Sequence, residues 1–114
     1  MNGILDIKGS KLIIRLCGEI DHHSAKDLRE QIDKVIFNGE IRECAFDFNK
    51  VGFMDSSGIG LIMGRYRLME AVGGSVSIFG VSAHLDKLFT VSGIRKIVKV
   101  YNCESEALPI ERVD

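Results

Sequence analysis

Hydrophobic and polar residues alternate at the start of the chain in a way that indicates two short β-strands. The apolar runs cover residues 4–7 and 12–17, and Lys8, Gly9 and Ser10 separate them. Two such runs divided by turn-forming residues are typical of a hairpin with a longer loop. We therefore expect the chain to begin with a pair of strands.

A helical pattern follows this hairpin. Apolar residues recur at positions 28, 32, 35 and 36, a spacing that places them on one face of a helix. Ser24 precedes the pattern, and Asp27 stands three residues after Ser24, a spacing that is typical of a weak capping box. Gly39 comes shortly after Phe37 as a stop signal. The pattern predicts a first helix from about Ser24 to about Phe37.

The middle of the chain repeats the order of strand and helix. Residues 44–49 alternate with a period of two, which predicts a third strand that ends near residue 49. An apolar stripe at positions 59, 62, 63, 66 and 69 predicts a second helix. Gly73 and Gly74 are expected to terminate that helix.

The last third of the chain continues the same order. Residues 75–81 and 97–101 are predicted to be the fourth and fifth strands. Between them we expect a short helix that Ser82 caps and Gly93 stops, and after them a last short helix that starts near Asn102.

These elements predict an α/β fold, with a mixed, mostly parallel sheet of about five strands and four helices. Parallel neighbours need crossover connections, and helices supply them after the opening hairpin. Partners and ligands of such sheets usually bind at the loops where strands end and helices begin. Residues 18–24 and 53–60 form the two loops of this kind with the most unusual composition.

The composition fits a single domain that spans residues 1–114. Hydrophobic residues make up 46% and charged residues 27% of the chain, the balance of an ordinary folded protein. The net charge of -1 offers no positive field, so we expect no nucleic acid and no membrane partner. Scattered cysteines and the lack of a signal peptide or long apolar run indicate a cytoplasmic protein.

The most unusual stretch is Phe53-Met54-Asp55-Ser56-Ser57-Gly58-Ile59-Gly60. One interpretation is that Asp55 or Ser56 only caps the helix that follows. The other is that a serine hydroxyl is displayed at the helix start for modification, while Gly58 and Gly60 let another protein approach closely. The two interpretations are compatible, and both stay open.

Catalytic and metal chemistry find little support in the residues. Neither serine has the flanking glycines of a nucleophile elbow, and no lysine follows the glycines as in a phosphate-binding loop. Asp21, His22 and His23 fall in the expected loop, where adjacent histidines point apart and form no zinc pair. We expect no catalytic residue, metal or cofactor. The alternatives are an enzyme with Ser56 as nucleophile and a histidine base, or a plain scaffold.

A resemblance to a known family rests on several of these stretches taken together. They are Gly18-Glu19-Ile20-Asp21-His22-His23-Ser24-Ala25, the stretch of residues 53–60, Gly64-Arg65-Tyr66, Gly73-Gly74 and Leu88-Phe89-Thr90-Val91-Ser92-Gly93-Ile94. With these signatures at matching separations, the chain resembles the STAS domains of bacterial anti-sigma factor antagonists from about residue 5 to residue 108.

This resemblance implies a STAS fold and a regulator with no catalytic activity. In such proteins the unphosphorylated form binds an anti-sigma factor that is also a serine kinase, and the sequestered sigma factor is released. The kinase inactivates the antagonist by phosphorylation, and a serine phosphatase restores it. By resemblance, the phosphoacceptor falls on Ser56 with Ser57 as the runner-up, and the partner-binding residues fall on Asp21, Ser56, Ser57, Gly58 and Ile59.

The resemblance also bears on which sigma factor is controlled. The triplet Asp21-His22-His23 favours the sporulation branch of the family. The alternatives are a STAS regulator of a general stress sigma factor and a nucleotide-binding module.

Overall fold

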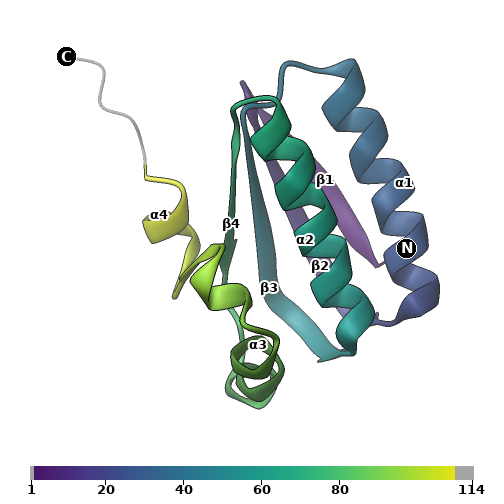
Figure 1. The fold of residues 1–114 in the computed structure, drawn as a ribbon, viewed down its shortest axis with the longest axis vertical. Coiled ribbons are helices and arrows are strands. Elements are labelled where there is room, and N and C mark those ends of the chain that lie inside the picture. The colour runs from purple at the N-terminus through teal and green to yellow at the C-terminus, as the bar shows by residue number, and fades with distance from the viewer. Residues whose placement is uncertain (1, 110–114) are drawn as a thin grey trace.

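The computed structural model describes residues 2–109 and contains a five-stranded mixed sheet (Figure 1). Its strands are β1 (Gly3–Lys8), β2 (Lys11–Ile20), β3 (Glu43–Met54), β4 (Ser75–Phe79) and β5 (Lys99–Tyr101), in the spatial order β1-β2-β3-β4-β5. The β1–β2 pair is antiparallel and the others are parallel, which confirms the predicted hairpin and mostly parallel sheet. The predicted domain of residues 1–114 also includes residues 1 and 110–114, which lie outside the described part.

Four helices alternate with the strands after the hairpin, as the sequence predicts. They are α1 (His22–Asn38), α2 (Ser56–Ala71), α3 (Asp86–Ser92) and α4 (Glu104–Ala107), and the short 3-10 turns η1 (Ala83–Leu85) and η2 (Ile94–Lys96) flank α3. Gly93 ends α3 with a φ of 76°, the left-handed conformation that a glycine stop requires. No helix of residues 2–109 is long and apolar enough to cross a membrane.

The main hydrophobic core lies between one face of the sheet and the helices α1, α2 and α3. Successive strands from β2 to β5 are added in one direction, and right-handed crossovers then place the connecting helices on the same side. Figure 1 shows α1 and α2 side by side over this face. Leu28 of α1, Ile62 of α2 and Phe89 of α3 are buried there with Phe46 of β3.

The opposite face of the sheet is covered in part by the short helix α4, whose Ala107 is buried against it. An ion network at Arg15 joins this helix to the strands. Nη1 of Arg15 lies 2.7 Å from Oε1 of Glu104 and 3.0 Å from Oδ2 of Asp47, and Nη2 lies 3.5 Å from Oδ2 of Asp6. The hydrogen bond to Glu104 is the main reason that the pKa of Arg15 is raised.

Two strands are longer than the sequence pattern predicts. β2 continues to Ile20 and β3 to Met54, whereas the predicted ends are residues 17 and 49. The β2–β3 register shifts between Arg15 and Cys17 and again between Gly18 and Glu19, as at β-bulges. Bulges interrupt the period-of-two alternation, so the pattern of apolar residues stops before the strands do.

The last two strands, β4 and β5, are instead shorter than the sequence pattern predicts. β4 ends at Phe79 because the next residue, Gly80, has a φ of 77° and leaves the extended conformation. β5 begins only at Lys99 because residues 94–96 form η2. Ser82 stands at the cap position of η1 but makes no capping hydrogen bond. Its hydroxyl lies 3.1 Å from Nδ1 of His84 instead.

The start of α2 packs closely on the end of β3 at Gly58. This glycine is buried, and a Cβ added to it would overlap Sδ and Cγ of Met54. Farther along the same helix, the Cβ position of Gly64 has no neighbouring atom within 4 Å. The absence of a side chain is therefore a packing requirement at Gly58 and not at Gly64.

We predict opposite effects of alanine at these two glycines. Gly58→Ala should destabilise the fold by about 1–3 kcal/mol, because overpacking displaces Met54 or the helix start. Gly64→Ala should stabilise the protein by up to about 1 kcal/mol, because alanine restricts the unfolded chain and favours helix. Urea unfolding of both variants measures the difference, and equal stability of the two would contradict this packing argument.

Candidate functional site

Two helices start side by side where β2 and β3 end. Ile20 and Met54 are the last paired residues of these strands, and the backbone N–H of Asp55 donates to the carbonyl of Ile20 over 3.2 Å. Asp21 and Asp55 follow the two strands directly, and each is the N-cap of the next helix. The two stretches singled out in the sequence thus meet at one edge of the sheet.

Asp55 is the residue that caps α2, and Ser56 is left free of that role. Oδ1 of Asp55 accepts from the backbone N–H of Ser57 over 2.8 Å, and its carbonyl accepts from the N–H of Gly58 over 3.1 Å. Ser56 is the first helical residue, and it is exposed. Its hydroxyl makes none of the side-chain hydrogen bonds found among residues 2–109. The hydroxyl of Ser56 is therefore open to a modifying enzyme.

The cap of α1 differs from the predicted one. The predicted capping box paired Ser24 with Asp27, but the structure has Asp21 as the N-cap and Ser24 at the third helical position. Oδ1 of Asp21 accepts from the N–H of Ser24 over 3.0 Å, and the Ser24 hydroxyl accepts from the N–H of Asp21 over 2.9 Å. Because β2 runs on to Ile20 and Asp21 caps the helix, α1 begins at His22, two residues before the predicted start at Ser24.

These hydrogen bonds also fix the charge of Asp21. The backbone N–H of Ser24, with its hydroxyl, holds the pKa of the Asp21 carboxyl below its ordinary value. A carboxylate that accepts hydrogen bonds in its ionised form keeps its charge at neutral pH. The side chain remains exposed, so this edge presents a permanent negative charge to solvent.

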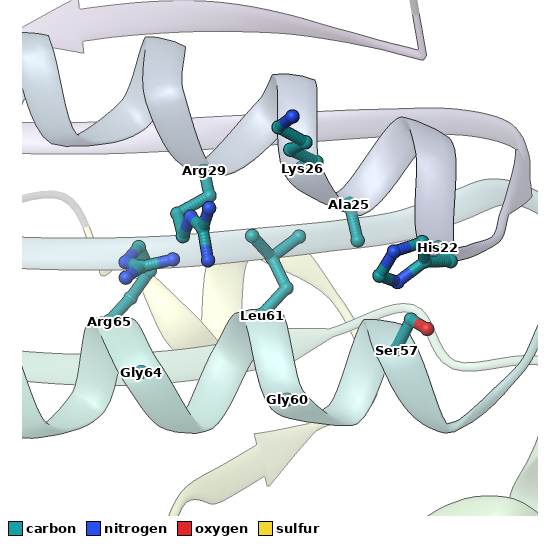
Figure 2. Close-up of a pocket in the computed structure, with 9 residues that line it drawn as sticks. All are labelled: His22, Ala25, Lys26, Arg29, Ser57, Gly60, Leu61, Gly64 and Arg65. Carbon is teal, nitrogen blue, oxygen red and sulfur yellow. The ribbon is translucent and has the colours of Figure 1, made fainter.

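The two histidines lie on α1 and not in a loop, which corrects the sequence prediction. His22 and His23 are the first two helical residues, and both are exposed. His22 lies beside Ser57 at one end of a groove between α1 and α2 (Figure 2). Within residues 2–109, no three His, Cys, Asp or Glu side chains are grouped so that they could hold a metal ion.

The remaining residues at the start of α2 have different surroundings. Ser57 is half-buried and faces the groove, and Ile59 is half-buried against the main core. Gly58 is buried beneath Met54, so its close approach is to the protein's own strand. Gly60 is exposed, with no atom near its Cβ position. Of the two glycines, only Gly60 leaves room for another protein.

Sequence reasoning missed two features of this edge. Phe53 stands 51% exposed one residue before the end of β3, beside Glu19 of β2. The apolar pair Phe53-Met54 was a signal of this, because neighbours on a strand point to opposite faces. The second feature is the basic groove between α1 and α2, whose residues are far apart in the sequence.

The site presents the hydroxyl of Ser56 to solvent at the start of α2. A serine at the first position of a helix lies next to N–H groups that favour a negative charge. No histidine or carboxylate side chain is found hydrogen-bonded to the Ser56 hydroxyl within the described residues. The arrangement suits a serine that another enzyme modifies.

Comparisons with known proteins agree with this fold. Residues 3–107 match the STAS domain family. The chain is 38% identical over 97 residues to the anti-sigma F factor antagonist of Paenibacillus polymyxa, covering 85% of this chain and 83% of that one. It is 32% identical over 103 residues to the anti-sigma-B factor antagonist of Bacillus subtilis, covering 88% and 92% of the two chains.

Solved structures give the same answer. The anti-sigma factor antagonist SpoIIAA in its unphosphorylated form superposes with a TM-score of 0.83 at 36% identity, covering 93% of this chain and 92% of that chain. The phosphorylated form of SpoIIAA, described as a Bacillus cell fate determinant, gives a TM-score of 0.74 at 36% identity, covering 93% and 96%. The chain therefore belongs to the STAS domain family, among its anti-sigma factor antagonists.

Proposed function

We propose that this protein releases a sigma factor by partner switching, controlled at Ser56. Its unphosphorylated form binds an anti-sigma factor that is also a serine kinase, and the bound sigma factor is set free. The kinase phosphorylates Ser56 and ends the binding, and a serine phosphatase restores the active form in the cytoplasm. The observation that carries this proposal is the exposed Ser56 hydroxyl at the start of α2, with Asp55 serving as the cap in its place.

Phosphorylation at this position changes the surface more than the fold. A phosphoserine adds a charge of about -1.5 to -2 at neutral pH. At the first residue of α2 this charge meets the N–H groups and the positive dipole end of the helix, which stabilise it. Asp55 and Asp21 oppose it, but water screens exposed charges strongly. A partner that closes over Ser56 has to desolvate the phosphate, so binding is lost while the fold stays intact.

The surface that we assign to the kinase partner surrounds Ser56. It consists of Asp21, Ser56, Ser57 and Ile59, and we add the exposed side chain of Phe53. An apolar group beside a fixed charge is the composition that protein interfaces use for affinity and orientation. Gly58 contributes to this surface indirectly, because its packing on Met54 sets the position of the helix start.

The sporulation branch is our proposal for the sigma factor that is controlled. Identity is 38% to the anti-sigma F factor antagonist of Paenibacillus polymyxa and 32% to the anti-sigma-B factor antagonist of Bacillus subtilis, and SpoIIAA is among the solved structures that match. The higher identity favours the first of these over a regulator of general stress. No feature of the described residues favours an enzyme that uses Ser56, because no base contacts its hydroxyl.

The phosphorylation site is tested with the anti-sigma factor kinase of the same organism and ATP. Peptide mass spectrometry should place one phosphate on Ser56, because Ser56 is exposed whereas Ser57 faces the groove. Ser56→Ala should abolish phosphorylation and keep binding to the kinase, and the matched variant Ser57→Ala should still be phosphorylated. Phosphate on Ser57 in the wild-type protein would refute the assignment.

The role of Asp21 is tested by a change that removes its charge and keeps its cap. Asparagine caps helices about as well as aspartate, so Asp21→Asn should leave the melting temperature nearly unchanged. It should weaken binding to the kinase roughly tenfold, as expected when a charged contact across an interface is lost. Isothermal titration calorimetry measures the affinity. Asp27→Asn is the control, since Asp27 is also exposed on α1; equal affinities of the two variants would remove Asp21 from the interface.

A further inference from the structure

A histidine contacts the strand that leads into the site, and the roles assigned so far leave this contact unexplained. His84 belongs to η1, and its Nε2 lies 2.5 Å from the carbonyl oxygen of Gly52 on β3. The two residues are 32 positions apart in the sequence, so the contact joins distant segments. Gly52 stands four residues before Ser56, and the contact therefore lies close to the proposed phosphoacceptor.

Gly52 is the extra residue of a β-bulge. In the β2–β3 register its neighbours Val51 and Phe53 pair with consecutive residues of β2, so Gly52 has no partner residue on that strand. The pairing of β3 with β4 ends earlier, at Asp47. A bulge residue is left out of the regular ladder of strand pairing. The imidazole of His84 contacts the carbonyl of Gly52 in place of a neighbouring strand.

The two contacts of the imidazole fix the position of its hydrogen. A carbonyl oxygen only accepts, so Nε2 of His84 carries the hydrogen and donates to Gly52. Nδ1 lies 3.1 Å from the hydroxyl oxygen of Ser82, and in the neutral ring this nitrogen accepts from the hydroxyl. In the protonated ring Nδ1 becomes a donor, and the same oxygen accepts from it. The hydrogen bond to Gly52 is therefore made in both charge states.

The turn that carries His84 is anchored in the main core. Leu85 follows His84 directly and is buried, and Phe89 of α3 is fully buried. The ring of Phe89 packs edge-on against that of Phe48 on β3, with the ring centroids 5.3 Å apart. His84 thus reaches the exposed Gly52 from a fixed base, and its hydrogen bond restrains the end of the strand.

We propose that His84 is a positioning residue for the partner-switching site, an inference that rests on the function proposed above. Residues 52–56 are held from β2 by the Asp55 N–H, which donates to the carbonyl of Ile20 over 3.2 Å. The hydrogen bond from His84 holds the same segment from η1. Together the two bonds set where the exposed side chain of Phe53 stands relative to the phosphoacceptor hydroxyl.

This restraint acts on recognition through the population of one arrangement. A partner binds only the fraction of molecules that already have the competent arrangement, and the apparent affinity falls in proportion to that fraction. Loss of the His84 hydrogen bond frees the segment from one of its two supports. The kinase then meets fewer molecules with the phosphoacceptor in place, although every residue of the partner surface is still present.

Amide hydrogen exchange of the free protein tests the restraint without the kinase. In His84→Ala the amide of Asp55 should exchange roughly three- to tenfold faster, the change expected when one neutral hydrogen bond is lost. His84→Gln should restore the slow rate, because its side-chain amide places an N–H donor near the position of Nε2. Thr90→Ala is the control, since Thr90 is also exposed and lies on α3. Equal rates at Asp55 in His84→Ala and Thr90→Ala would overturn the positioning role.

The effect on recognition is measured with the anti-sigma factor kinase and ATP. His84→Ala should raise KM for the antagonist roughly three- to tenfold and leave kcat unchanged, because only the competent fraction of the substrate falls. His84→Gln should recover the wild-type KM. An unchanged KM in His84→Ala, or no recovery in His84→Gln, would contradict the proposal. Wild-type protein that takes no phosphate would instead refute the switch at Ser56, so the two failures are distinguishable.

Discussion

The parallel pairing of β2 with β3 continues past its last pair, Ile20 and Met54, into the hydrogen bond from the Asp55 N–H to the Ile20 carbonyl. This bond holds the two residues that follow these strands, Asp21 and Asp55, close together at the same edge of the sheet. Asp21 and Asp55 then cap α1 and α2 at neighbouring positions. Stretches that are more than thirty residues apart in the sequence form one surface for this reason, and the proposed switch at Ser56 lies on that surface.

The packing of α1 and α2 gives this surface a rigid base and divides its roles. Capping by Asp55 frees the Ser56 hydroxyl for modification, while Gly58 presses the helix start against Met54. A charge added at Ser56 therefore meets a helix whose position the core already fixes, and the main consequence of that charge lies with the partner. The groove that begins at Ser57 lies between the same helix and α1.

The order of elements and the sheet type follow from the sequence because period and turn residues are local signals. Ser56 and Asp21 are singled out by the resemblance of the motifs around them to a known family, and their roles are proposals. The bulges in the β2–β3 pairing hide the true strand ends, so the cap of α1 is predicted at Ser24 and not at Asp21. The environment of Gly58 and the contact of His84 with Gly52 depend on tertiary packing between separate segments, and no local pattern encodes them.

The central claim is that one phosphate on Ser56 acts at the surface that the β2–β3 pairing creates and leaves the fold unchanged. Amide spectra of the isotope-labelled protein before and after phosphorylation test it most directly. We predict that chemical-shift changes concentrate in residues 20–24 and 53–60, which lie together at one sheet edge, and that β4 and β5 keep their shifts. Changes spread across the whole sheet would show that phosphorylation rearranges the fold, and would contradict this account.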